Sequence, residues 1–337
     1  MTNSTPILSH ENPGGGRSDL TAAIVFGSDK TKIGSSELNT AIQKAVDDGL
    51  YFESNSGGLG DVIVWAGLTD LFARLDNMTP NQKAVLVITS SNPDAAELFK
   101  WHPKFDQILI VSLGFACVTD DKFREKFGLP IPRVNGVKPS KEKQFVPYPS
   151  NADKRYLSTL PSQYVAFSVI SSDGRADGTG RTVPEKITHD LLLATLEFGL
   201  TPVFLGRNYK YSVDADLSPG IARSDPAIID IPGVIYAKDK LSAAGTVQAI
   251  YNSTASVVCN SSGMCASWFS GRPTYLLWSE EDCRTYYPCK HLTFGLDYPK
   301  NTHVLFERYT RDTFFKFLHT AIEPDTSLQK VPCKKDL

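Results

Sequence analysis

The sequence has little of what a metal centre, a disulfide scaffold or a membrane span requires. Its six cysteines include no CxxC pair, and none lies at zinc-ligand spacing from a histidine, so we expect reduced thiols and no bound metal. The six histidines form no spaced ligand set. No apolar run approaches the ~20 residues that cross a bilayer, which predicts no stable membrane insertion.

A large excess of charge of one sign is also missing. Lys and Arg number 35 against 37 Asp and Glu, giving a formal net charge of −2 at pH 7. No global positive field would hold the chain on nucleic acid, although a local basic patch stays an open alternative. Residues 1–20 lack the basic and apolar segments of a secretory signal, so we expect a flexible arm and a cytoplasmic protein.

The sequence instead contains two successive series of short apolar segments that alternate with amphipathic ones. A Pro-, Lys- and Ser-rich stretch at residues 134–163 separates them. In the first series we expect strands at 22–26, 49–55, 83–89 and 105–111, and helices at 36–48, after the glycines at 57–60, and at 92–100. In the second we expect strands at 164–170, 201–205, 234–237, 255–259 and 274–278, and helices at 184–198, 242–251, after 260–264, and at 311–322.

This alternation predicts the α/β fold class, with two Rossmann-like, doubly wound parallel-sheet domains facing a cleft. We place the flexible arm at 1–20, an N-terminal domain at 21–158 and a C-terminal domain at 159–337. Packing of the C-terminal helix back on the first domain is one expected arrangement. Ligands of such folds bind outside the carboxyl ends of the strands, so the loops at those ends are the candidate sites.

In the first half, Gly58, Leu59, Gly60 and Asp61 form a Gly-rich turn at the start of a helix. Glycines let backbone N–H groups approach an anion, and the helix N-terminus favours negative charge, so Gly58, Leu59 and Gly60 are also candidate donor-binding residues. Asp61 could accept a proton from a hydroxyl group. A tight turn with Asp61 stabilising the helix start is an equally good interpretation. The pattern is neither a Walker loop nor a GxGxxG fingerprint.

In the second half, three loops at expected strand ends carry groups that bind anions. By itself, each fits an ordinary surface loop or helix cap. Together they would supply hydroxyls, guanidinium groups and backbone N–H groups to a diphosphate. These candidate donor-binding residues are Ser171, Ser172 and Arg181 in the first loop, Gly206 and Arg207 in the second, and Ser261, Ser262, Gly263 and Met264 in the third.

Three segments, GGLGDVIVWAGLTDL, VISSDGRADGTGRTVPEK and the later SVVCNSSGMCASWFSG, resemble motifs of the bacterial heptosyltransferase-like glycosyltransferase family, the relatives of ADP-heptose:lipopolysaccharide heptosyltransferase. The resemblance implies the GT-B fold. It places Asp61 at the position of the catalytic base, Arg181 at that of a phosphate-binding Lys, and 261–264 on the donor-binding turn. The sequence departs from the family at Ser261, where the family usually has Asp, and at Ala266, where it usually has His.

The resemblance implies an inverting, metal-independent transfer from a nucleotide-diphosphate sugar, a co-substrate, with no cofactor. The acceptor would be a glycan, a lipid-linked glycan or another hydroxyl compound. One alternative is a non-catalytic nucleotide-sugar-binding homologue; another is a glycosyltransferase acting on modified DNA bases, with residues 138–143 as its basic face. GGLGDV also resembles the donor loop of glycogen and starch synthases, but Asn55 stands where that family has Lys.

Overall fold

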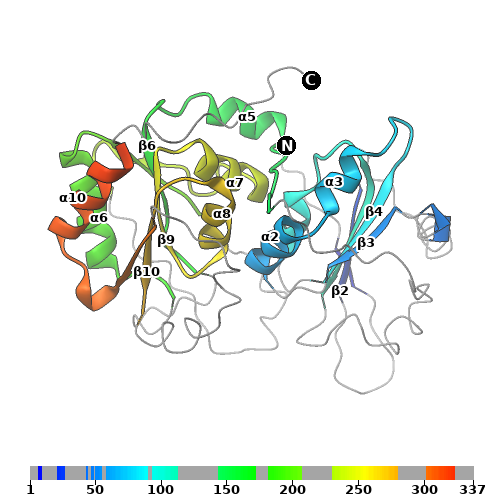
Figure 1. The fold of residues 1–337 in the computed structure, drawn as a ribbon, viewed down its shortest axis with the longest axis horizontal. Helices are drawn as coiled ribbons and strands as arrows, with labels where there is room; N and C mark the ends of the chain where they lie inside the picture. Colours follow the sequence, from blue (N-terminus) through cyan, green and yellow to red (C-terminus); the bar gives the residue numbers. More distant parts are fainter. Residues whose placement is uncertain are drawn as a thin grey trace.

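The chain folds around two β-sheets with helices between and outside them (Figure 1). The computed structural model describes residues 7–9, 21–26, 43–44, 47–48, 50–54, 58–89, 93–112, 143–171, 181–206, 230–279 and 301–322. Within these ranges, no helix is long and apolar enough to cross a membrane.

The first sheet has five strands in the order β1-β2-β5-β4-β3. Its strands are β1 (Ile7–Ser9), β2 (Thr21–Phe26), β3 (Tyr51–Ser54), β4 (Ala84–Thr89) and β5 (Phe105–Ser112). Strands β3, β4 and β5 are parallel, whereas β2 runs antiparallel to β5 and β1 antiparallel to β2. The helices of this half are α2 (Leu59–Leu68), α3 (Leu71–Asp76) and the 3₁₀ helix η1 (Pro93–Leu98).

The second sheet has six parallel strands in the order β11-β10-β9-β6-β7-β8. They are β6 (Tyr164–Ser168), β7 (Thr201–Phe204), β8 (Ile235–Tyr236), β9 (Ala255–Cys259), β10 (Thr274–Trp278) and β11 (Asn301–Leu305). Numbered from β6, the order is 3-2-1-4-5-6, the Rossmann arrangement, so the connections reverse direction between β6 and β9.

Helices cover both faces of the second sheet (Figure 1). On the outer face lie α6 (Glu185–Glu197) and α10 (Arg311–Ile322), which follows the short η2 (Phe306–Arg308). On the inner face lie α7 (Ala243–Asn252) and α8 (Ser262–Ser270). Side chains of successive strand residues lie on opposite faces of the sheet: Val257 packs with the outer helices and Val258 with the inner ones. Continuous apolar segments therefore suit strands that are buried on both sides.

The inner face of the second sheet shares its core with the first half. One apolar cluster joins Phe52 and Leu86 of the first sheet to Val258 and Leu276 of the second. Helix α2 packs beside α8, and η1 packs beside α7. The two sheets are thus held in one arrangement by buried surface, and α2 and α8 form the junction between them.

A buried carboxylate joins the segment between the sheets to the second half. Asp153 lies in the short helix α5 (Asn151–Leu157) and is 3% exposed. It accepts hydrogen bonds from the backbone N–H and hydroxyl of Ser150 at 2.8 and 2.7 Å, and from those of Ser242 at 2.8 and 2.7 Å. Ser150 and Ser242 are the N-caps of α5 and α7. One side chain therefore fixes the starts of two helices.

The α/β class with parallel sheets is confirmed. One detail is wrong: α10 does not pack back on the first half, because Phe314 packs against Tyr275 of β10 and Arg311 bonds Asp190 and Glu197 of α6. The sequence also gave no indication of β1, α5 or β11, nor of the antiparallel direction of β2. The helix expected at 36–48 lies mostly outside the described residues. The boundary at 158/159 remains a prediction.

Candidate functional site

The predicted donor-binding residues of the second half that the structure describes lie around the point where the second sheet reverses its connections. Strands β6 and β9 are neighbours, and their carboxyl ends lead to Ser171 and to Ser261 respectively. Strand β7 lies on the other side of β6 and leads to Gly206. Loops that leave adjacent parallel strands in opposite directions open a crevice between them, where ligands of such sheets bind.

Ser171 and Arg181 are brought together although they are ten positions apart. The Ser171 N–H donates to the Thr182 hydroxyl at 3.0 Å, and the Val183 N–H donates to the Val169 carbonyl at 3.0 Å. The segment that contains Arg181 therefore returns alongside the end of β6. Ser171 is 5% exposed, so its side chain forms part of the floor of this region.

Helix α8 begins tightly against the end of β6. Ser261 is its N-cap, and its hydroxyl accepts the Gly263 N–H at 3.3 Å. A Cβ atom on Gly263 would collide with the Ser168 hydroxyl, so only glycine allows this close approach. The Met264 side chain is buried in the core, which leaves its backbone as the part able to meet a ligand. N–H groups of a first turn have no partners within the helix and favour an anion.

Helix α2 begins directly opposite this turn. A Cβ atom on Gly60 would lie 3.6 Å from the Ser262 nitrogen and 3.0 Å from the Cys265 sulfur. Asp61 therefore lies within a few residues of the α8 turn, across the junction between the two halves. Its Oδ2 atom accepts the Gly58 N–H at 2.7 Å, so the carboxylate does stabilise the helix start. The side chain is nevertheless exposed, as a group that exchanges protons with a substrate must be.

The pKa of Cys265 is affected by charged groups from both halves of the molecule. Its thiol is buried, and its pKa is raised to about 12 by burial first and then by the Asp61 carboxylate, while Arg181 acts in the opposite direction. A carboxylate from the first half and a guanidinium from the second thus act in opposite directions on the pKa of the same thiol. Burial of the thiol therefore favours its protonated form.

Asn260, which lies between β9 and the N-cap of α8, opens the third predicted loop but was not among the predicted donor-binding residues. Asn260 is 5% exposed, and its Nδ2 atom has no hydrogen-bond partner among the residues that the structure describes. Buried amide groups are nearly always paired, so an unpaired donor beside the crevice needs an explanation. A polar residue that ends an otherwise apolar strand was the only signal in the sequence.

The remaining predictions for the site divide into described and undescribed residues. Gly206 adopts a positive φ of 146° after β7, and its carbonyl accepts the Asp239 N–H at 3.0 Å. Ser172, Arg207 and residues 138–142 lie outside the described residues. Ala266 is fully buried. Among the described residues, no group of three His, Cys, Asp or Glu side chains could hold a metal ion.

Comparison with known proteins gives structural matches only. No protein-family model and no curated protein sequence matches the chain. A glycosyl transferase family 9 structure from Veillonella parvula matches with a TM-score of 0.50 at 10% identity, covering 81% of this chain and 97% of that one. E. coli ADP-heptose lps heptosyltransferase II matches with a TM-score of 0.49 at 13% identity, covering 80% of this chain and 98% of that one. E. coli heptosyltransferase WaaC with ADP matches with a TM-score of 0.45 at 11% identity, covering 80% of this chain and 96% of that one. The resemblance expected from the motifs is thus found at the level of the fold, which the chain shares with the family 9 structure.

Proposed function

We propose that this protein transfers a sugar from a nucleotide-diphosphate sugar to an acceptor hydroxyl, with inversion and without a metal ion. The observation that carries the proposal is the placement of Asp61, at the start of α2, opposite the N-terminal turn of α8 at the switch point of the second sheet. The shared fold with a glycosyl transferase family 9 structure supports it.

The second half would hold the donor. The diphosphate would accept hydrogen bonds from the N–H groups of the first α8 turn, from Arg181 and from the hydroxyl of Ser171. Ser172 and Arg207, which lie outside the described residues, would join them. Guanidinium groups and helix N-termini stabilise the charge that develops on a leaving diphosphate. The unpaired Nδ2 of Asn260 would donate to a donor oxygen, which gives this buried group its missing partner.

The first half would hold the acceptor. Asp61 would take the proton from the acceptor hydroxyl, whose oxygen then bonds to the anomeric carbon from the face opposite the diphosphate. The bond from that carbon to the diphosphate breaks, and the diphosphate leaves with the electron pair. The bond from the Gly58 N–H fixes one carboxylate oxygen and leaves the other for the acceptor. In this scheme residues 21–158 form the acceptor domain and 159–337 the donor domain.

Asp61→Asn tests the assignment of the base. Asparagine keeps an oxygen for the Gly58 N–H, so the start of α2 is retained, but it cannot accept the proton. We expect turnover, measured as nucleoside diphosphate released across a panel of donors and acceptors, to fall by ~10²–10⁴-fold with donor affinity unchanged. The matched control is Asp76→Asn, an exposed carboxylate at the end of α3.

Two results would count against parts of the proposal, and a third would favour its non-catalytic alternative. Full turnover in Asp61→Asn would remove Asp61 from the role of base. Loss of turnover on treatment with EDTA would contradict metal independence. Specific binding of a nucleotide sugar without turnover for any acceptor would favour the non-catalytic homologue. Its support is that Ser261 and Ala266 stand where the family usually has Asp and His.

A further inference from the structure

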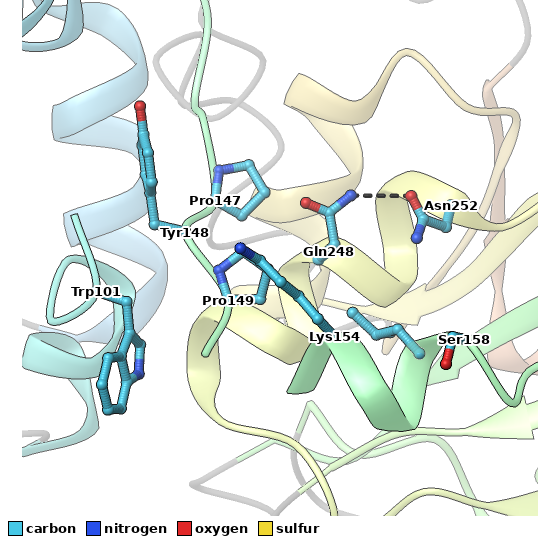
Figure 2. A pocket seen from close by; sticks show the side chains of 9 residues that line it. Trp101, Pro147, Tyr148, Pro149, Lys154, Ser158, Gln248 and Asn252 are labelled. Atoms are coloured by element: carbon cyan, nitrogen blue, oxygen red, sulfur yellow. Dashed lines mark hydrogen bonds between the residues drawn. The ribbon is translucent and has the colours of Figure 1, made fainter. Parts of the chain in front are cut away.

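A hollow lies on the side of the molecule away from the α8 turn. Its volume is about 490 Å³, and it is lined by Trp101, Pro147, Tyr148, Pro149, Lys154, Leu157, Ser158, Gln248 and Asn252 (Figure 2). Gln248 and Asn252 lie in the second half of α7, just before β9 begins at Ala255, whereas the α8 turn follows the end of β9. A strand of this length separates the two places by about 15 Å.

The wall from the first half is flat and apolar. Trp101 is 42% exposed, one of two large apolar side chains described as exposed. The Tyr148 ring is held in place by the His102 ring at a centroid distance of 4.1 Å. The Tyr251 hydroxyl donates to the Phe145 carbonyl at 2.7 Å, and this bond holds the segment 145–148, which includes Pro147 and Tyr148, against α7. Rigid, preformed aromatic surfaces lower the cost of binding.

The opposite wall offers hydrogen-bonding groups at fixed positions. The Gln248 Nε2 donates to the Asn252 Oδ1 at 2.9 Å, so the Gln248 oxygen and the Asn252 Nδ2 are the remaining acceptor and donor of the pair. Figure 2 shows the Gln248 oxygen directed toward Pro147. An amide pair that presents both an acceptor and a donor beside an aromatic wall fits a ligand with apolar faces and hydroxyl edges.

Positive charge faces this hollow. The Lys154 side chain extends from α5 toward Pro149 (Figure 2), and the Lys100 ammonium lies 5.2 Å from the centre of the Trp101 ring. None of the nine lining residues is acidic. The nearby Asp76 carboxylate contributes, after burial, to raising the pKa of Tyr148, whose hydroxyl points away from Lys154. The charge therefore favours an anionic group on the ligand.

We propose that this hollow is a second carbohydrate-binding site, which takes an oligosaccharide with carboxylate groups. Trp101 and Tyr148 would contact the sugar faces, Gln248 and Asn252 would bond the hydroxyls, and Lys154 would meet a carboxylate. The choice of a saccharide over other anionic ligands rests on the proposed glycosyl transfer. Binding at the hollow is independent of the α8 turn, so the site would hold a part of the glycan remote from the reaction.

Titration of the intact protein with three probes, followed by saturation-transfer NMR of the probe, tests the proposal. The probes are trigalacturonate, the neutral trimer cellotriose and a decaproline peptide, since an aromatic groove with prolines could also hold a Pro-rich segment. We expect trigalacturonate to bind more tightly than cellotriose, and decaproline not to bind. Trp101→Ala should weaken trigalacturonate binding by at least about fivefold, as loss of a central aromatic contact does. Lys154→Gln should weaken it about threefold or more and reduce its dependence on salt.

Matched controls separate this site from the proposed transfer site. Lys316→Gln removes an exposed lysine from α10 and should leave trigalacturonate binding unchanged. ADP affinity, measured on the same samples, should be the same in Trp101→Ala and the parent protein. Any one of four results would overturn the inference: trigalacturonate does not bind, cellotriose binds equally well, decaproline binds better, or Trp101→Ala does not change trigalacturonate binding. None of these results would affect ADP binding, so they would not count against the proposed transfer. Conversely, failure of the proposed transfer together with trigalacturonate binding that depends on Trp101 would refute the proposed function and leave this site.

Discussion

Acid should destabilise this protein through one buried histidine, His102. This residue is 4% exposed, and its pKa is lowered from 6.5 to about 4 by burial first and then by the positive charge of Lys104. Its Nδ1 accepts the Lys104 N–H at 3.2 Å, a bond that protonation of Nδ1 would remove. Because the folded pKa lies below the unfolded one, the unfolded chain binds the proton more strongly. The stability contribution is complete above pH 6.5 and is lost as pH falls toward 4.

The expected size follows from these two pKa values. The loss is about 1.4 kcal/mol at pH 5.5, about 2.5 kcal/mol at pH 4.5, and about 3 kcal/mol in all. His102→Asn keeps an acceptor for the Lys104 N–H but does not titrate. Urea unfolding at pH 4.5, 5.5, 6.5 and 8 should show a flatter dependence for this variant by those amounts, and the control His319→Asn, at an exposed position of α10, should not. An equally steep dependence in His102→Asn would refute the assignment.

Two further predictions concern residues that position the junction and the site. Asp153→Ala leaves the N–H groups of Ser150 and Ser242 without their acceptor, so it should lower the free energy of unfolding by about 2–5 kcal/mol. Urea unfolding measures this loss, with the exposed Asp47→Ala as the control. A loss below about 0.5 kcal/mol would contradict the role of Asp153 as a shared cap. Gly263→Ala should push the start of α8 away from Ser168, costing about 1–3 kcal/mol and weakening ADP binding. Adding Ser168→Gly should restore part of the ADP affinity, and a Gly263→Ala variant with unchanged melting and ADP binding would show that the close approach is unnecessary.

The elements that the sequence predicted correctly are those with a local signal. Continuous apolar segments marked β4, β6 and β9 because strands buried on both faces have no polar side, and the Gly-rich turns marked the starts of α2 and α8. The missed elements lack such a signal. Strand β11 is a short edge strand with the sequence NTHVL, and α5 follows a Pro-rich stretch.

Features that depend on tertiary contacts could not be predicted from local patterns. The direction of β2 depends on its pairing with β5, and the place of α10 depends on Tyr275 and Asp190, which are distant in the sequence. Asp61 and Arg181 were both predicted as site residues, but only the fold shows that both affect the pKa of the same buried thiol. The unpaired Asn260 became visible only once its surroundings were known.

The central claim is that a nucleoside diphosphate binds at the carboxyl ends of the neighbouring strands β6 and β9, where the chain leaves them in opposite directions. A crystal structure of the protein with ADP or UDP tests it most directly. We predict that diphosphate oxygens lie within hydrogen-bond distance, ~3 Å, of N–H groups of the first α8 turn, with the Arg181 guanidinium beside them. Asp61 should lie on the opposite side of the nucleotide's terminal phosphate, where the acceptor would bind. A nucleotide bound elsewhere, with the α8 turn and Arg181 making no contact to phosphate, would contradict the account.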